Sequence, residues 1–194
     1  KGKQKPYINF LDFDFAFAMD FSNGIKGSQY VPFNTYQPSF DVHDQENLVA
    51  NWIQITNSSS QRSSGALTFF DSEGNELARE RLTLGAKTRK DISAHRFGKN
   101  KIGYAQWQPD SANVQFHIKN VRYLYDNKSG ENSFATAFQI SGAKTIEHYG
   151  HAPIDTNNQM SVLELSNITN DYQYIQLVAH KKSGQQALRT WVWL

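Results

Sequence analysis

The sequence predicts an all-β protein: an antiparallel β-sandwich built from two related, internally duplicated strand sets. Three observations support this prediction. Aromatic residues make up 13% of the 194-residue chain, and ring side chains favour strands. Apolar and polar side chains alternate along most of the chain, which is the pattern of strands with one buried face. Two stretches, 51–84 and 161–194, repeat one pattern without a gap.

About eleven strands are expected, joined by short turns rich in Ser, Asn and Gly. In chain order they cover residues 11–19, 52–56, 65–71, 76–84, 88–95, 102–108, 114–126, 134–141, 162–168, 174–181 and 189–194.

The first strand is followed by the longest stretch that we expect to be irregular, residues 23–47, which is rich in Gly, Pro, Asn and Gln. Tyr30, Phe33 and Tyr36 lie there among polar neighbours, a mixture common in recognition surfaces. Loops of this length in compact domains are often functional. We therefore expect these rings either to contact a partner or to cover one end of the sandwich.

The next strands have clear alternation. Ile53 and Ile55 share one face, and Gly74 marks the turn between the third and fourth strands. In the strand 114–126, Val114, Phe116 and Ile118 alternate on one face, and the alternation then shifts to the other face near residues 119–120. Such a shift predicts a β-bulge.

The repeat relates residues 110 positions apart (167 − 57), and it carries five identities in 34 aligned positions. The identical pairs are Asn57 and Asn167, Leu67 and Leu177, Gly74 and Gly184, Arg79 and Arg189, and Leu84 and Leu194. We assign copy one to about residues 10–126 and copy two to about 133–194. Each Asn is expected to turn the chain by bonding its own backbone.

Copy two is short, and chains near sixty residues are marginal at burying a core. We therefore expect residues 1–194 to form a single body.

The repeat singles out Trp191 and Trp193, which align with Arg81 and Thr83. These positions are expected to face outward, because their neighbours Val192 and Leu194 align with core positions. Either copy one covers the two indoles, or they form a binding or homo-oligomer contact through the C-terminal strand.

The segments NWIQITNSS (51–59) and GALTFFDSEGNEL (65–77) resemble the strand–turn–strand core of bacterial immunoglobulin-like or fibronectin-III-like surface modules. Those modules often carry an F-x-D-x-x-G-N turn, which is matched here from Phe69 to Asn75. The resemblance covers about 35 residues. It implies an extracytoplasmic (periplasmic, secreted or cell-surface) module with an adhesive, scaffolding or carbohydrate-associated role.

Composition excludes several classes of function. The formal net charge of +2 is too small to indicate nucleic-acid binding. The absence of cysteine excludes disulfides, thiolate chemistry and cysteine-based metal sites. No apolar run approaches the ~20 residues of a membrane-spanning helix.

Candidate catalytic and metal residues are few. Asp41, His43 and Asp44 could hold a divalent cation, but a solvated acidic loop is the simpler interpretation, so neither a metal nor a cofactor is predicted. Asp12 and Asp14 could be paired carboxylates of a glycan-acting enzyme.

The function expected from the sequence is a non-enzymatic binding or assembly module with a protein or carbohydrate partner. A carbohydrate-binding module is the alternative, and an enzyme using Asp12, Asp14 or Asp41 comes third.

Overall fold

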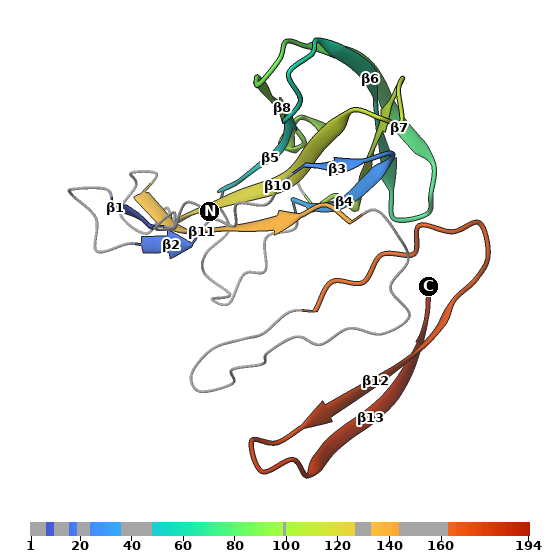
Figure 1. Ribbon diagram of the computed structural model, residues 1–194. Coiled ribbons are helices and arrows are strands. Elements are labelled where there is room, and N and C mark those ends of the chain that lie inside the picture. Colours follow the sequence, from blue (N-terminus) through green and yellow to red (C-terminus); the bar gives the residue numbers. More distant parts are fainter. Residues whose placement is uncertain are drawn as a thin grey trace. The chain divides into compact units, whose positions relative to one another are not determined.

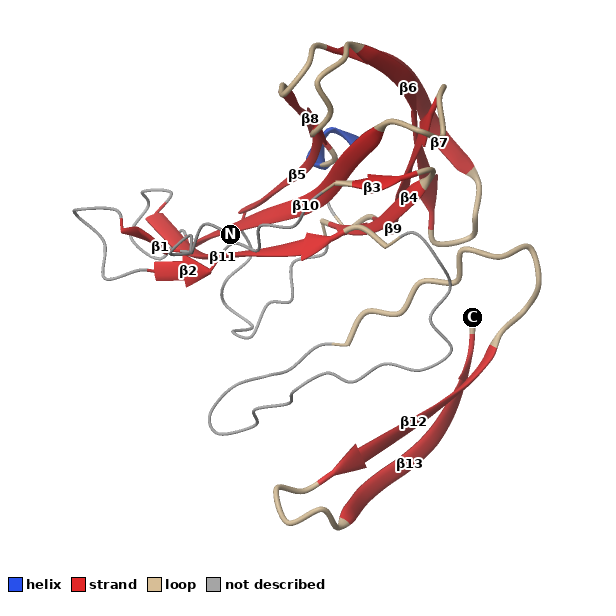
Figure 2. Cartoon of the chain, in the orientation of Figure 1, coloured by secondary structure: helices blue, strands red, loops and turns tan. Residues whose placement is uncertain are grey.

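The computed structural model describes residues 7–9, 16–18, 24–35, 48–98, 100–126, 133–143 and 163–194. These residues are mostly in strands, and their one helical element is the short 3-10 turn η1 (His95–Phe97), as Figure 2 shows. Within these ranges, no helix is long and apolar enough to span a membrane. The predicted all-β class is confirmed.

The chain forms two compact units, Lys1–Thr145 and Ile146–Leu194. The first unit is a sandwich of two antiparallel sheets (Figure 1). The five-stranded sheet contains, in order, β11 (Ser133–Ser141), β10 (Gln115–Asp126), β5 (Leu48–Asn57) and β8 (Arg89–Ser93), with β3 (Ile25–Lys26) paired to β10. The four-stranded sheet has the order β4 (Gln29–Asn34), β9 (Ile102–Pro109), β6 (Ser63–Asp71) and β7 (Glu76–Leu84). A small separate sheet pairs β1 (Tyr7–Asn9) with β2 (Ala16–Ala18).

The core of this unit lies between the two larger sheets and takes alternate side chains from each. Ile53 and Ile55 are fully buried, as their alternation predicted. Trp107 of β9 meets Phe116 of β10 edge to face, with ring centroids 5.0 Å apart. This contact joins the two sheets, and such aromatic pairs add about 0.5–1.5 kcal/mol beyond the area they bury.

Buried amides also connect the sheets. The Gln29 side chain donates from Nε2 to the main-chain oxygen of Phe116 (2.9 Å) and accepts from the N–H of Ile118 (3.2 Å). The Asn120 side chain donates to the main-chain oxygen of Pro32. Buried polar groups are costly unless they are paired, so these bonds favour one arrangement of β4 on β10.

The prediction that residues 23–47 are irregular is wrong for the first half of this stretch, which contains β3 and β4. Gln29, Val31 and Phe33 alternate and point into the core, but Pro32 and the polar neighbours mask that pattern. Pro is tolerated because β4 is an outer strand of its sheet. Phe33 is 0% exposed and belongs to the core between the two sheets.

The bulge predicted near residues 119–120 is absent from β10, which pairs with β5 without a break from Phe116 to Tyr125. The pattern shifts there because Lys119, Asn120 and their neighbours are buried on both faces of the strand. The irregularity in β10 lies elsewhere, in its pairing with β11 between Leu124 and Tyr125.

The second unit contains a two-stranded sheet of β12 (Tyr174–His180) and β13 (Gln186–Trp193). The strand predicted at 162–168 is not observed in its described part, 163–168. Its counterpart β5 is held between β8 and β10. The described part of the second unit has no equivalents of those two strands, and a strand needs neighbours for its backbone groups. That residues 1–194 form a single body stays a prediction.

Candidate functional site: the ring face of the C-terminal hairpin

The hairpins β6–β7 and β12–β13 have the same strand register at a spacing of 110 residues. Ser64 pairs with Thr83, and Tyr174 pairs with Trp193. Every following pair corresponds, including a register irregularity after Phe69 in one hairpin and after Ala179 in the other. The turn glycines Gly74 and Gly184 have φ of 85° and 84°, a left-handed conformation that glycine adopts without strain. The repeat seen in the sequence is therefore a repeat of backbone structure in these hairpins.

The two repeated asparagines make the same hydrogen bonds. Asn57 Oδ1 accepts the N–H of Ser59 (3.0 Å), and its Nδ2 donates to the main-chain oxygen of Gln61 (2.7 Å). Asn167 does the same with Thr169 (2.9 Å) and Asp171 (2.8 Å). The predicted turns, in which Asn bonds nearby backbone, are confirmed in both copies.

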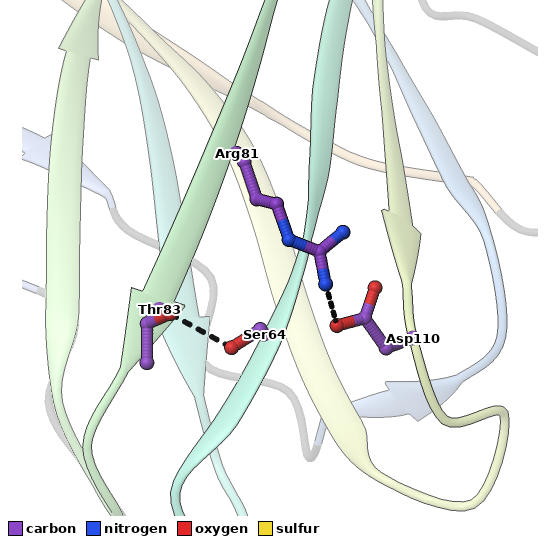
Figure 3. Close-up of polar contacts among 4 residues, drawn as sticks. All are labelled: Ser64, Arg81, Thr83 and Asp110. Atoms are coloured by element: carbon purple, nitrogen blue, oxygen red, sulfur yellow. Dashed lines mark hydrogen bonds and ion pairs between the residues drawn. The ribbon is translucent and has the colours of Figure 1, made fainter.

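In copy one, the outward face of the hairpin is polar, as Figure 3 shows. Ser64 and Thr83 share a hydrogen bond of 2.7 Å, and Arg81 forms an ion pair of 2.5 Å with Asp110. Leu82 and Leu84, on the other face of β7, are buried. This is the arrangement expected of a strand with one face in water.

In copy two, the equivalent positions carry three rings, Tyr174, Trp191 and Trp193, which we call the ring face. The Tyr174 ring stacks on Trp191 with centroids 4.6 Å apart and planes 10° apart. Its centroid lies 4.3 Å from that of Trp193, with planes 30° apart. The exposed fractions are 50% for Tyr174, 47% for Trp191 and 69% for Trp193. Three large rings therefore remain in water on one side of a two-stranded sheet.

Tyr174 was not among the residues predicted from the sequence. The repeat aligns Tyr174 with Ser64, but the importance of that position becomes clear only from the strand register, in which Ser64 lies opposite Thr83. Pairing the strands of the second hairpin in the same register brings Tyr174 beside Trp193.

Of the other predicted binding residues, Tyr30 lies in β4 of the first unit and is half-buried. Its hydroxyl accepts a hydrogen bond from Gln106 Nε2 (3.1 Å), and its ring lies 6.4 Å from that of Tyr104. Burial, with a smaller contribution from the Tyr30 phenol, raises the pKa of Tyr104 above its usual value. Tyr104 also stacks on Phe70 at 4.8 Å, so Tyr30 belongs to a second, less exposed ring cluster.

Several predicted positions lie outside the described residues. They are the binding residue Tyr36, the metal candidates Asp41, His43 and Asp44, and the paired carboxylates Asp12 and Asp14. The described residues contain no group of three or more His, Cys, Asp or Glu side chains that could hold a metal ion.

Comparison with known proteins identifies no family. No family model matches the chain, and no curated protein matches it. Among solved structures, the crystal structure of Thermotoga maritima 1070 aligns with a TM-score of 0.44 and 14% sequence identity. The alignment covers 63% of this chain and 96% of that one.

The chemistry that the ring face offers is recognition. It combines polarisable ring faces with a phenol and two indole N–H donors. Such groups stack on planar partners or on the C–H faces of sugars, and their polar atoms can orient the bound molecule. This arrangement suits binding rather than covalent chemistry.

Proposed function

We propose that this protein is a non-enzymatic binding module of a secreted or surface protein, and that the ring face is its contact surface. The observation that supports the proposal is the replacement of Ser64, Arg81 and Thr83 by three exposed rings on a backbone of the same register. Each ring carries on the order of 200 Å² of surface, most of it apolar, and burying that surface in a complex is favourable.

A protein partner is the first candidate ligand. Aromatic side chains are enriched in the cores of protein interfaces, and Trp, Tyr and Arg are enriched among the residues whose truncation weakens binding most. The polar residues on the same face as the rings, Gln176 and Arg189, would then form part of the rim.

A carbohydrate is the second candidate, and the exposure of Trp193 favours it. Trp193 is 69% exposed although the Tyr174 ring lies against it at an interplanar angle of 30°. An indole with so much free surface can take the apolar face of a sugar.

The test compares the full chain with a variant that carries the copy-one residues, Tyr174→Ser, Trp191→Arg and Trp193→Thr. Both proteins are applied to a glycan array and to an array of purified surface proteins. Ring-dependent binding to a glycan supports the carbohydrate candidate, and ring-dependent binding to a protein supports the first. Equal binding by the two chains, or no binding by either, would contradict the proposal. A matched control places the same rings in copy one, with Ser64→Tyr, Arg81→Trp and Thr83→Trp.

A further inference from the structure

The strand β12 is uncharged along its whole length. Residues Tyr174 to His180 contain no Lys, Arg, Asp or Glu. Its counterpart β6 lies between β7 and β9. Of the four outer strands of the two large sheets, β7 carries Glu76 and Arg79 and β8 carries Arg89 and Asp91, whereas β4 and β11 have no charged residue. Charges on outer strands oppose edge-to-edge pairing, and β12 lacks that protection.

One edge of β12 is open among the described residues. Gln173 and Leu194 exchange two main-chain hydrogen bonds of 2.9 Å at the end of the hairpin. Antiparallel pairing alternates, so the main-chain groups of Tyr174, Gln176 and Val178 point away from β13. In copy one, the equivalent groups of β6 bind β9, as in the bond from the N–H of Asp110 to the oxygen of Ser64 (2.9 Å). The first hairpin therefore indicates that this edge takes an antiparallel strand.

The β12–β13 hairpin does not fit the place that β6–β7 occupies in the sandwich of another molecule. A Cβ atom at Gly65 would lie 2.6 Å from both the Trp107 ring and the Gln108 main-chain oxygen. The equivalent residue in copy two is Ile175, which has a much larger side chain. Exchange of hairpins between two molecules is therefore sterically blocked.

We infer that the open edge of β12 pairs antiparallel with β12 of a second copy of this chain, about a two-fold axis at Leu177. This register leaves no residue of Tyr174–His180 without a partner, because Gln176 lies opposite Val178, and Tyr174 lies opposite His180. The residues that then exchange hydrogen bonds are those whose main-chain groups point to the open edge. An interface of this kind is self-complementary, as two-fold symmetry requires.

The side chains also agree with this register. On one face, Leu177 meets its own copy, and Ile175 meets Ala179. The strand brings no like charges together, because it has none. A two-stranded hairpin is marginally stable in water, whereas three or more strands with an apolar face can be stable. Pairing produces a four-stranded sheet with β13 at each outer edge. The contact uses the main chain of β12, so it goes beyond the proposed ligand binding by the ring face.

Sedimentation velocity of the full chain over a concentration series tests the inference with two proline variants. Gln176→Pro removes an N–H that points to the open edge of β12 and none that bonds β13. The matched control Arg189→Pro removes an N–H on the outer edge of β13. We expect a dimer for the natural chain and for Arg189→Pro, and a monomer for Gln176→Pro. A monomeric natural chain, or equal loss of the dimer in both variants, would overturn the inference.

A cross-link provides a second, independent measurement that does not require proline. The chain has no cysteine, so Leu177→Cys introduces one thiol per molecule. In the inferred register, the two copies of residue 177 form a close pair with Cα atoms about 4.5 Å apart, which suits a disulfide. Mild oxidation should convert most of this variant to a covalent dimer. The control Thr190→Cys lies on the same face in β13 and should remain monomeric, and equal cross-linking of both variants would refute the two-fold pairing.

Discussion

Asn167 donates a hydrogen bond from its side chain to the main-chain oxygen of Leu194 over 3.2 Å, as Asn57 does to Leu84 over 3.4 Å. Each bond links the turn before a hairpin to the last residue of that hairpin. Asn57 is fully buried and also donates to the oxygen of Gly85 (2.9 Å). One amide side chain therefore ties together three segments of backbone.

Replacing Asn57 by Ala should lower the free energy of unfolding by about 1–3 kcal/mol, because buried carbonyl groups lose their donor. Urea denaturation of the full chain measures this change. Asn57→Asp is the matched control, since it keeps the acceptor for Ser59 and loses the donors. It should also be destabilised, whereas a variant as stable as the natural chain would contradict the role of the donated bonds.

Gly65→Ile, which copies the residue of the second hairpin, should destabilise the sandwich by about 1–3 kcal/mol or more through overpacking against Trp107. Thermal unfolding measures the effect. The reciprocal change, Ile175→Gly, should leave the melting of the sandwich unaltered, because it lies in the second unit. An unchanged melting temperature for Gly65→Ile would show that the Trp107 side chain moves aside easily at this point.

The turn at Asp71 should make stability depend on acid. Slight burial acts to raise the pKa of Asp71, but hydrogen bonds from the main chain and side chain of Asn75 and from the N–H of Glu73 outweigh it and hold the pKa below its ordinary value of 3.8. The folded state therefore binds the proton more weakly than the unfolded state does. The ionised Asp71 carboxylate therefore stabilises the folded state fully above pH 3.8. This contribution is lost as the pH falls through the pKa that Asp71 has in the folded state, which is lower than 3.8.

Thermal unfolding at a series of pH values, from neutral to strongly acidic, measures this dependence. Asp71→Asn should be less stable than the natural chain at neutral pH and should show a flatter acid limb. The equivalent residue in copy two is Lys181, so the second hairpin lacks this carboxylate. If the melting temperature of the variant falls as steeply with decreasing pH as that of the natural chain, the pH dependence of stability comes from other carboxylates.

The stacked rings should stabilise the second hairpin. A double-mutant cycle of Tyr174→Ala and Trp193→Ala should give a coupling free energy of about 0.5–1.5 kcal/mol, the usual range for aromatic pairs. Hydrogen exchange of the Thr190 and Leu177 amides reports the opening of the hairpin. The copy-one pair Ser64 and Thr83, which shares a hydroxyl hydrogen bond, is the polar comparison. A coupling free energy near zero for Tyr174 and Trp193 would show that the ring contact does not stabilise the hairpin.

The repeat alignment predicted the outward face of Trp191 and Trp193. Periodicity predicted the strand class and the core face of Ile53 and Ile55, because one buried face gives a clear alternation. It failed where that condition is not met. In β10, Lys119 and Asn120 lie on opposite faces of the strand and are both buried. The alternation of apolar and polar residues therefore breaks there without a bulge. The strand β4 was missed because Pro32 obscures the alternation of Val31 and Phe33. Tyr174 was missed because its site depends on which residue lies opposite, which requires strand register.

The hydrogen bond between Gln29 and Phe116 has a consequence for how the protein is made. The bond spans 87 residues of chain, and β4 can pack on β10 only after both have been synthesised. The β6–β7 hairpin needs no distant partner, and isolated hairpins form in about 1–10 μs. As the chain emerges from the ribosome, this hairpin should form long before β10 has been synthesised and can cover its apolar face. Nascent chains halted before residue 116 should therefore bind chaperones or hydrophobic dyes at Leu67 and Phe69, and chains released beyond β10 should not.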